Sequence, residues 1–305
     1  MSSAKLHITD EITQALASGR PVVALESTII SHGLPYPENV KIANAIEQTV
    51  RDTGAIPATI AILDGQIKIG LSPTDLEILA HPDSGVIKVS RRDIGSVIAR
   101  KAHGATTVAS TMIFAEMAGI SVFATGGIGG VHKGAETDFD ISADLLELSR
   151  TNVAVVSAGP KAILDLPLTM EYLETHGVPV IGYGTDELPA FWSRQSGITL
   201  TDSVDTPEDI AAIMNAKWDL GLSGGIVIAN PVPKADEIKA DALADIIESA
   251  LQTARAKGIS GKAITPFLLD WIRQKTDGRS LATNQALVMN NAKVAAQIAV
   301  AYANR

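Results

Sequence analysis

Short, wholly apolar runs alternate with longer amphipathic segments along most of the chain. Runs such as Pro21–Leu25, Val122–Ala124 and Val153–Val156 have the length and composition of strands that are buried on both faces. The segments between them repeat apolar residues every three or four positions, which is typical of helices that cover a sheet. This alternation predicts an α/β fold with a mostly parallel, mixed central sheet covered by helices.

The pattern also gives approximate bounds for each element. Strands are predicted at Pro21–Leu25, Thr59–Leu63, Gln66–Ile69, Val86–Val89, Val122–Ala124, Val153–Val156, Val178–Tyr183 and Gly225–Ala229. Helices are predicted from an N-cap at Thr9 to Ala17, at Glu38–Thr53, Pro73–Ala80, Arg91–Ala102, Thr111–Ala118, from about Ile141, and at Thr169–His176, Thr206–Leu220, Ala235–Lys257, Thr265–Lys275 and Ser280–Tyr302. Asp64-Gly65 is typical of a type I′ hairpin, and the small residues of Thr106–Ser110 predict a turn. No linker or repeat interrupts the pattern, so residues 1–305 are expected to form one domain.

Composition and charge exclude several kinds of partner and of site chemistry. The net charge of −9 has no basic block to offset it, so nucleic acid is not an expected partner. The chain has no cysteine, which excludes disulfides, thiolate metal sites and thiol nucleophiles. The first residues lack the pattern of a signal peptide, and no apolar run has the length of a membrane span. We therefore expect a cytoplasmic protein without a membrane partner.

The most informative stretch is Ser121–Leu166, where a buried strand ends in a cluster of glycines at Gly126–Gly130. The dinucleotide-binding fingerprint fails here, because His132 stands at its third glycine position. A turn that needs positive φ is the simpler interpretation of one glycine. Four glycines in five residues after a buried strand favour a loop that approaches a ligand closely.

An acidic segment follows, with Asp138, Asp140 and Asp144 leading into a helix. One interpretation makes Asp140 a helix N-cap and Asp144 a solvated carboxylate of the first turn. The other makes the segment an oxygen-rich site for Mg²⁺ or Mn²⁺, held by one or two carboxylates and by water. The neighbouring glycine cluster is the observation that supports the metal site.

Three charged residues lie at or beside buried strands. Lys161 follows Ala158-Gly159-Pro160 at the end of one strand, and partial burial of a lysine favours its nucleophilic amine form. Glu26 ends another strand, where a buried carboxyl group can keep its proton and act as an acid. A surface lysine and an internal salt bridge are the structural alternatives. Lys88 is a third charge on a strand, and three such charges are unusual for scaffolding alone.

Longer motifs carry a resemblance that covers essentially the whole chain. They are Ala24–Gly33 (ALESTIISHG), Lys88–Asp93 (KVSRRD), His103–Met112 (HGATTVASTM), Phe123–Glu136 (FATGGIGGVHKGAE), Phe139–Leu145 (FDISADL), Ala158–Asp165 (AGPKAILD), Gly184–Trp192 (GTDELPAFW), Gly224–Pro233 (GGIVIANPVP) and Thr265–Leu269 (TPFLL). In these motifs the sequence resembles the pseudouridine-5′-phosphate glycosidase family, to which an indigoidine synthase A-like subgroup is related.

The resemblance implies an α/β/α sandwich that assembles as a homotrimer. It also implies reversible cleavage of the C-glycosidic bond of pseudouridine 5′-phosphate to uracil and ribose 5-phosphate, with one divalent cation per subunit, usually Mn²⁺, with Mg²⁺ as the alternative. By the same resemblance Lys161 forms a covalent adduct at ribose C1′, Glu26 donates a proton to uracil, and Asp140 binds the metal. The residues expected to contact substrate are Lys88, Val108, Ser142, Ala143, Asp144, Asn284 and the glycine-loop residues Thr125, Gly126, Gly127, Gly129 and Gly130.

The residue types suit that chemistry, because the bond to be broken joins two carbons. The leaving carbon of uracil has no lone pair for a proton, unlike the oxygen expelled by ordinary glycosidases. An amine at Lys161 and an acid at Glu26 fit the two tasks of holding ribose and protonating C5. Two rivals remain open at this point: a Schiff-base aldolase or lyase acting on a sugar phosphate, and a non-catalytic sugar-phosphate or nucleotide sensor.

Overall fold

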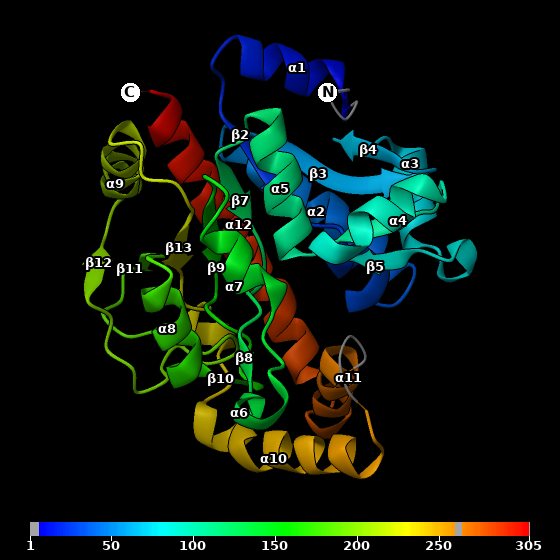
Figure 1. The fold of residues 1–305 in the computed structure, drawn as a ribbon, viewed down its shortest axis with the longest axis vertical. Coiled ribbons are helices and arrows are strands. Elements are labelled where there is room, and N and C mark those ends of the chain that lie inside the picture. Colours follow the sequence, from blue (N-terminus) through cyan, green and yellow to red (C-terminus); the bar gives the residue numbers. More distant parts are fainter. Residues whose placement is uncertain (1–5, 260–263, 305) are drawn as a thin grey trace.

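A computed structural model describes residues 6–259 and 264–304, and its centre is one large sheet with helices on both faces (Figure 1). The strands of this sheet are β1 (Leu6–Ile8), β2 (Val22–Leu25), β3 (Ile56–Leu63), β4 (Gln66–Ile69), β5 (Ile87–Val89), β6 (Gly104–Thr106), β7 (Val122–Ala124), β9 (Ala154–Ser157), β11 (Val180–Tyr183), β12 (Asp202–Val204) and β13 (Ile226–Ala229). Strands β8 (Val131–His132) and β10 (Leu164–Asp165) form a separate antiparallel pair.

The strand order is β1-β4-β3-β2-β7-β9-β13-β11-β12, with β6 and then β5 attached to β3. Neighbours from β3 through β2 to β12 run parallel, whereas β3 is antiparallel to both β4 and β6. The predicted mixed, mostly parallel sheet is therefore confirmed. So is the hairpin at Asp64 and Gly65, because both residues have positive φ and Leu63 pairs with Gln66.

Helices form a layer on each face, which confirms the α/β/α sandwich. One layer contains α2 (Glu38–Asp52), α9 (Pro207–Asp219), α10 (Ala240–Ala256), α11 (Ile264–Lys275) and α12 (Arg279–Ala303). The other contains α1 (Asp10–Ala17), α5 (Val108–Ala118), α7 (Ala143–Leu148) and α8 (Leu166–Thr175). The remaining helices are α3 (Pro73–Ala80), α4 (Ile94–Ala99) and α6 (Ala135–Asp138).

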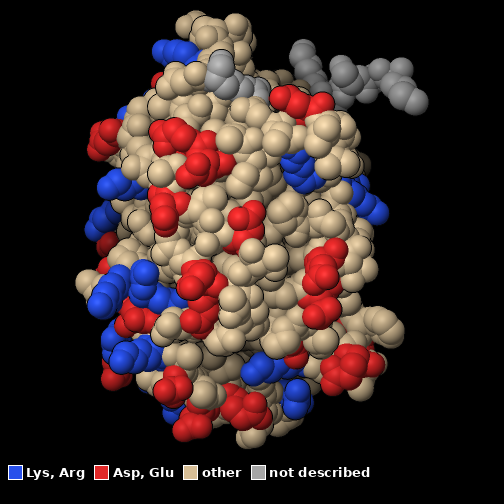
Figure 2. Space-filling view, turned by 90° about the vertical axis from the view of Figure 1, so that its left-hand side faces the viewer, with Lys and Arg blue, Asp and Glu red and all other residues tan. Residues whose placement is uncertain are grey.

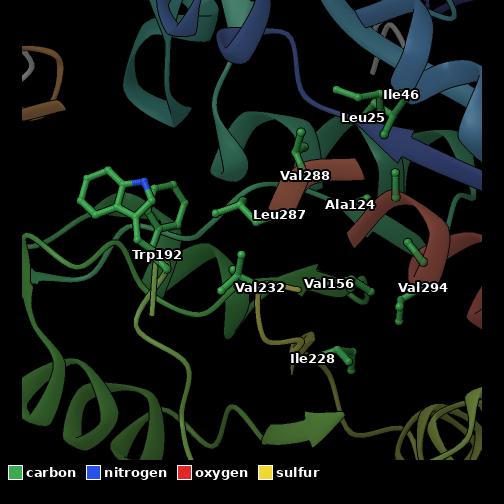
Figure 3. Packing of buried hydrophobic residues seen from close by; sticks show 14 of the residues in the cluster. Leu25, Ile46, Ala124, Val156, Trp192, Ile228, Val232, Leu287, Val288 and Val294 are labelled. Carbon is green, nitrogen blue, oxygen red and sulfur yellow. The ribbon is translucent and has the colours of Figure 1, made fainter. Parts of the chain in front are cut away.

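The central strands are apolar throughout because both of their faces are covered. Leu25, Ala124, Val156 and Ile228 lie side by side on the face that packs against α12 (Figure 3). Their sequence neighbours Ala24, Phe123, Val155 and Val227 point to the opposite face and pack with α5 and α7. This two-sided burial fixes the register of the strands, and with it the positions of the residues that follow their carboxyl ends.

Several predicted bounds are wrong, each for a local reason. Thr106–Ser110 is not a turn: Gly104–Thr106 forms β6, and α5 begins at Val108 after an extended Thr107. The predicted helix Arg91–Ala102 is a 3-10 turn followed by α4, and the chain turns at Lys101, whose φ is +52°.

Two other helices also begin elsewhere. Helix α8 begins before Thr169, because the Asp165 carboxylate caps it by accepting the Leu168 N–H. Helix α10 begins only at Ala240, after a 3-10 turn at Lys234–Asp236.

Strands β1, β6, β8, β10 and β12 were not predicted from the sequence. Each has only two or three residues, too few to show a period. Figure 2 shows one face of the molecule, on which acidic side chains are scattered and no continuous basic surface forms. No helix among the described residues is both long and apolar enough to cross a membrane.

Candidate active site

A cavity of about 1090 Å³ opens at the carboxyl ends of the parallel strands, the edge at which sheets of this kind bind ligands. It is large enough for a nucleotide-sized molecule. Twelve of the predicted site residues line it: Glu26, Lys88, Val108, Gly126, Gly127, Gly129, Asp140, Ser142, Ala143, Asp144, Lys161 and Asn284. Thr125 and Gly130 lie behind this lining; Thr125 is fully buried, and Gly130 packs against Thr169.

The glycine loop and the segment that carries Lys161 run side by side beyond the ends of β7 and β9. The Ile128 N–H donates to the Gly159 carbonyl oxygen at 3.2 Å, and the Lys161 N–H donates to the Ile128 carbonyl oxygen at 3.2 Å. The Lys161 Nζ donates to the Gly127 carbonyl oxygen at 3.0 Å. The backbone of one loop therefore holds the amine of the other at the cavity wall.

The glycines of this loop are required by close packing rather than by positive φ. A Cβ at Gly127 would lie 2.6 Å from a ring carbon of Phe191, and one at Gly129 would lie 2.2 Å from the Ser142 Oγ. Neither residue has positive φ. The simple turn interpretation of the cluster is therefore wrong, and the loop is a tightly packed wall of the cavity.

Glu26 follows β2 and reaches the cavity beside Lys161. Its partner is the Thr125 hydroxyl, which donates to Oε1, so a basic side chain is not what holds it. Burial raises the pKa of the Glu26 carboxyl group, while the positive charge of Lys161 and the Thr125 hydrogen bond oppose this rise. A carboxyl group that retains its proton to higher pH is suited to act as a general acid.

Asp144 is not a solvated carboxylate of the first turn, because it is only 7% exposed. Its Oδ1 accepts the Ala109 N–H at 3.0 Å, and its Oδ2 accepts the Gly129 N–H at 2.9 Å. The side chain thus joins the start of α5 to the glycine loop. The N-cap of α7 is Ser142, so the interpretation of Asp140 as an N-cap is also wrong.

Asp140 lines the cavity with a carboxylate that accepts no hydrogen bond from a described residue. The described ranges 6–259 and 264–304 contain no group of three His, Asp or Glu residues that could coordinate a metal directly. One carboxylate with several waters is nevertheless an accepted donor set for Mg²⁺ or Mn²⁺. The residues present therefore fit a hard cation that keeps most of its water.

Donors for an anionic group lie at the start of α5 and on β5. Three N–H groups near the start of α5 are engaged: that of Thr106 by Ser27, that of Thr107 by Val89 and that of Ala109 by Asp144. The Val108 N–H has no acceptor among the described residues, so it can donate to a ligand at this helix start, where the helix dipole favours a negative charge. Lys88 on β5 adds a positive charge to the same cavity.

Asn284 reaches the cavity from α12. Its Oδ1 accepts the indole N–H of Trp192 at 2.6 Å, and this bond fixes the orientation of the amide. The NH₂ group of the same amide is thereby left to donate. Asn284 can therefore recognise a carbonyl or hydroxyl oxygen of a ligand.

Two histidines line the cavity that the sequence did not single out, His32 and His132. Burial lowers the pKa of His32, and the charge of Lys88 lowers it further. Burial also lowers the pKa of His132, although the acidic charge of Asp140 opposes this effect. His32 is next to Gly33, and His132 lies two residues from both Gly130 and Gly134, in the motifs quoted above; their position in these motifs was the available signal.

The fold and the cavity define an α/β/α protein with a small-molecule site at the carboxyl edge of a parallel sheet. The chain belongs to the indigoidine synthase A like protein family, whose model matches residues 11–301. Relatives named pseudouridine-5′-phosphate glycosidase include one from Staphylococcus aureus, 62% identical, with 95% of this chain and 94% of the relative covered. Another, from Geobacillus kaustophilus, is 60% identical over 96% of this chain and 97% of the relative.

A solved structure has the same fold. It is the prealnumycin C-glycosynthase AlnA in complex with ribulose 5-phosphate, which superposes with a TM-score of 0.91 at 40% identity, over 98% of this chain and 97% of that one. The family resemblance stated from the sequence is therefore confirmed.

Proposed function

We propose that the protein is an enzyme that reversibly cleaves the C1′–C5 bond of pseudouridine 5′-phosphate, giving uracil and ribose 5-phosphate. Relatives with this name cover nearly the whole chain at about 60% identity. The observation that carries the proposal is the placement of Lys161 and Glu26 in one cavity, with their side chains close enough for the lysine charge to act on the glutamic acid. The structural neighbour AlnA, named as a C-glycosynthase and bound to a sugar phosphate, supports the same class of bond and substrate.

The two side chains supply complementary chemistry. The Lys161 amine attacks C1′ and displaces O4′, which gains a proton as the ribose ring opens. The nitrogen lone pair then forms a C1′=N bond while the electron pair of the C1′–C5 bond passes to uracil, and C5 takes the Glu26 proton. Water adds to the C1′=N bond, releases ribose 5-phosphate and restores the amine. The sum is one water consumed for each bond cleaved.

The remaining cavity residues bind and orient the substrate. Lys88 and the N–H group of Val108, which both line the cavity, would hold the phosphate, and the Ser142–Asp144 segment would contact the substrate. The Asn284 amide can donate to a ligand oxygen. Asp140 would hold one divalent cation per subunit, Mn²⁺ with Mg²⁺ as the alternative, and that ion would supply positive charge beside the anionic substrate.

The proposal is tested by incubating the purified protein with pseudouridine 5′-phosphate and Mn²⁺ and measuring free uracil by chromatography. We expect uracil and ribose 5-phosphate in equal amounts. An aldolase acting on sugar phosphates would release no uracil, and a sensor would bind the nucleotide without turnover. A folded, Mn²⁺-supplied protein that binds the nucleotide and releases no uracil would contradict the proposal.

The family resemblance also implies assembly as a homotrimer. Sedimentation equilibrium should give the mass of three chains. A single-chain mass across the concentrations used for assays would contradict this part of the proposal.

A further inference from the structure

The contact between Glu26 and Thr125 follows from the strand register. Leu25 pairs with Ala124, and Ala124 pairs with Val156, in parallel neighbours. The next residues of the three strands, Glu26, Thr125 and Ser157, therefore form a row across the carboxyl edge of the sheet. Side chains in such a row point to the same face at the spacing of adjacent strands. The backbone alone thus brings the Thr125 hydroxyl to the Glu26 carboxyl group.

Thr125 is held by hydrogen bonds on both of its backbone groups. Its N–H donates to the Val156 carbonyl oxygen at 3.0 Å, and its carbonyl oxygen accepts the Asn291 Nδ2 at 2.8 Å. Asn291 in turn accepts the Asn230 Nδ2 at 2.8 Å. Thr125 and Asn291 are fully buried and Asn230 is 4% exposed, so water does not compete for these bonds. The hydroxyl of Thr125 is consequently presented from a fixed position.

This hydroxyl has one proton, and it donates that proton to Oε1 of Glu26. A carboxylic acid whose Oε1 accepts a hydrogen bond carries its own proton on Oε2. We propose that Thr125, braced by Asn291 and Asn230, is a positioning residue that orients Glu26 and selects Oε2 as the oxygen that delivers the proton to the substrate. This inference rests on the acid role of Glu26 in the proposed function.

A positioning role makes a prediction that simple packing does not. A hydrogen bond to the charged form of a carboxyl group lowers its pKa, and the Thr125 hydroxyl acts in this direction on Glu26. Removing the hydroxyl therefore raises the pKa of Glu26. Since the acid works in its protonated form, the pH at which activity falls on the alkaline side should move upward in the variant, although the poorly oriented acid works more slowly.

The test compares Thr125→Val, which keeps the shape, with Thr125→Ser, which keeps the hydroxyl. Ser157→Ala is the matched control, because the Ser157 hydroxyl lies in the same row, is buried, and has no hydrogen-bond partner among the described residues. Melting temperatures establish that the variants fold. The measurements are kcat and KM for uracil release as functions of pH, and a ¹³C NMR titration of the Glu26 carboxyl carbon, assigned with Glu26→Gln.

We expect Thr125→Val to lose kcat on the order of 10- to 100-fold with little change in KM, and to shift both the pH profile and the NMR titration upward. Thr125→Ser should restore most of the rate, and Ser157→Ala should behave as wild type. A wild-type profile and titration in Thr125→Val would overturn the inference, as would an equal shift in Ser157→Ala. If the wild type releases no uracil, the proposed function fails, while the NMR titration still decides whether Thr125 controls Glu26.

Discussion

At the scale of single residues, the cavity brings together a carboxyl group, Glu26, and an amine, Lys161. Glu26 is pushed toward its neutral form by burial, and Lys161 beside it offers a positive charge that pulls the other way. A raised pKa suits Glu26, because this carboxyl group must still carry its proton after Lys161 has bonded to the sugar. The pH dependence of the reaction is therefore expected to follow the pKa of Glu26.

Glu26→Gln should lower kcat by about 10²- to 10⁴-fold with a small change in KM, because the amide keeps the size of the acid and has no proton to give. In the wild type, activity should fall as pH rises through the raised pKa of Glu26, since the deprotonated form cannot donate. Pre-steady-state uracil release and a pH series measure both effects.

The matched control for Glu26→Gln is Glu47→Gln. Burial also raises the pKa of Glu47, but this residue bonds to Thr59 outside the cavity. The Glu47→Gln variant should lose activity at the same alkaline pH as the wild type. A Glu26→Gln variant that melts lower and turns over at near the wild-type rate would show that Glu26 is structural.

Asp140→Ala should weaken Mn²⁺ binding at least by the roughly 10- to 100-fold that loss of a supporting group costs, because no described side chain replaces its carboxylate. Isothermal titration calorimetry measures the affinity independently of activity. Glu136→Ala, an exposed carboxylate in the same segment, is the control. Unchanged Mn²⁺ affinity in Asp140→Ala, or full activity after chelation, would contradict the assignment of Asp140 as the metal ligand.

At the scale of elements, the glycine loop depends on what lies against each missing side chain. Gly129 touches Ser142 and the carboxylate of Asp144, and the Asp144 bridge joins this loop to the start of α5. Three segments far apart in the sequence are thereby fixed relative to one another. The loop forms the wall against which Lys161 is held.

Gly129→Ala should destabilise the protein by about 1–3 kcal/mol, because its Cβ would overlap the Ser142 Oγ and push α7 away. The substitution should also reduce turnover, because it would disturb the hydrogen bond from the Gly129 N–H to the Asp144 carboxylate, which holds the loop. Gly95→Ala in α4 is the control, because its Cβ would meet nothing within 4 Å and alanine favours a helix. Denaturant unfolding of both variants decides the point; equal stabilities would contradict the packing argument.

The same loop shows what the sequence could and could not predict. The apolar runs determine the central strands, and strand ends bring Glu26, Gly127 and Lys161 to one edge, so the location of the site was predictable. Whether a glycine serves positive φ or close packing depends on Phe191 and Ser142, which approach only in the fold. The buried role of Asp144 was hidden for the same reason, because its partners are backbone N–H groups of distant segments.

At the scale of the whole molecule, α12 connects the catalytic edge to the packed interior. This helix lies along β7 and β9 (Figure 1), and its residues Leu287 and Val288 pack with the strand residues shown in Figure 3. From the same helix, Asn284 reaches the cavity and Asn291 holds the backbone of Thr125. The long helix was predictable from its periodicity, and the family resemblance singled out Asn284. The role of Asn291 could be seen only in the fold, because its partners Thr125 and Asn230 are distant in the sequence.

The central claim is that Lys161 forms a covalent bond to the sugar during cleavage, and borohydride trapping tests it most directly. Borohydride added during turnover of pseudouridine 5′-phosphate reduces a C1′=N bond to a stable amine, which peptide mass spectrometry locates. We expect the mass of the reduced ribose phosphate on the peptide that carries Lys161. Lys161→Ala should show no adduct and a turnover lower by several orders of magnitude, whereas exposed Lys133→Ala should resemble wild type. An adduct on another lysine, or uracil release without any trapped adduct, would contradict the account.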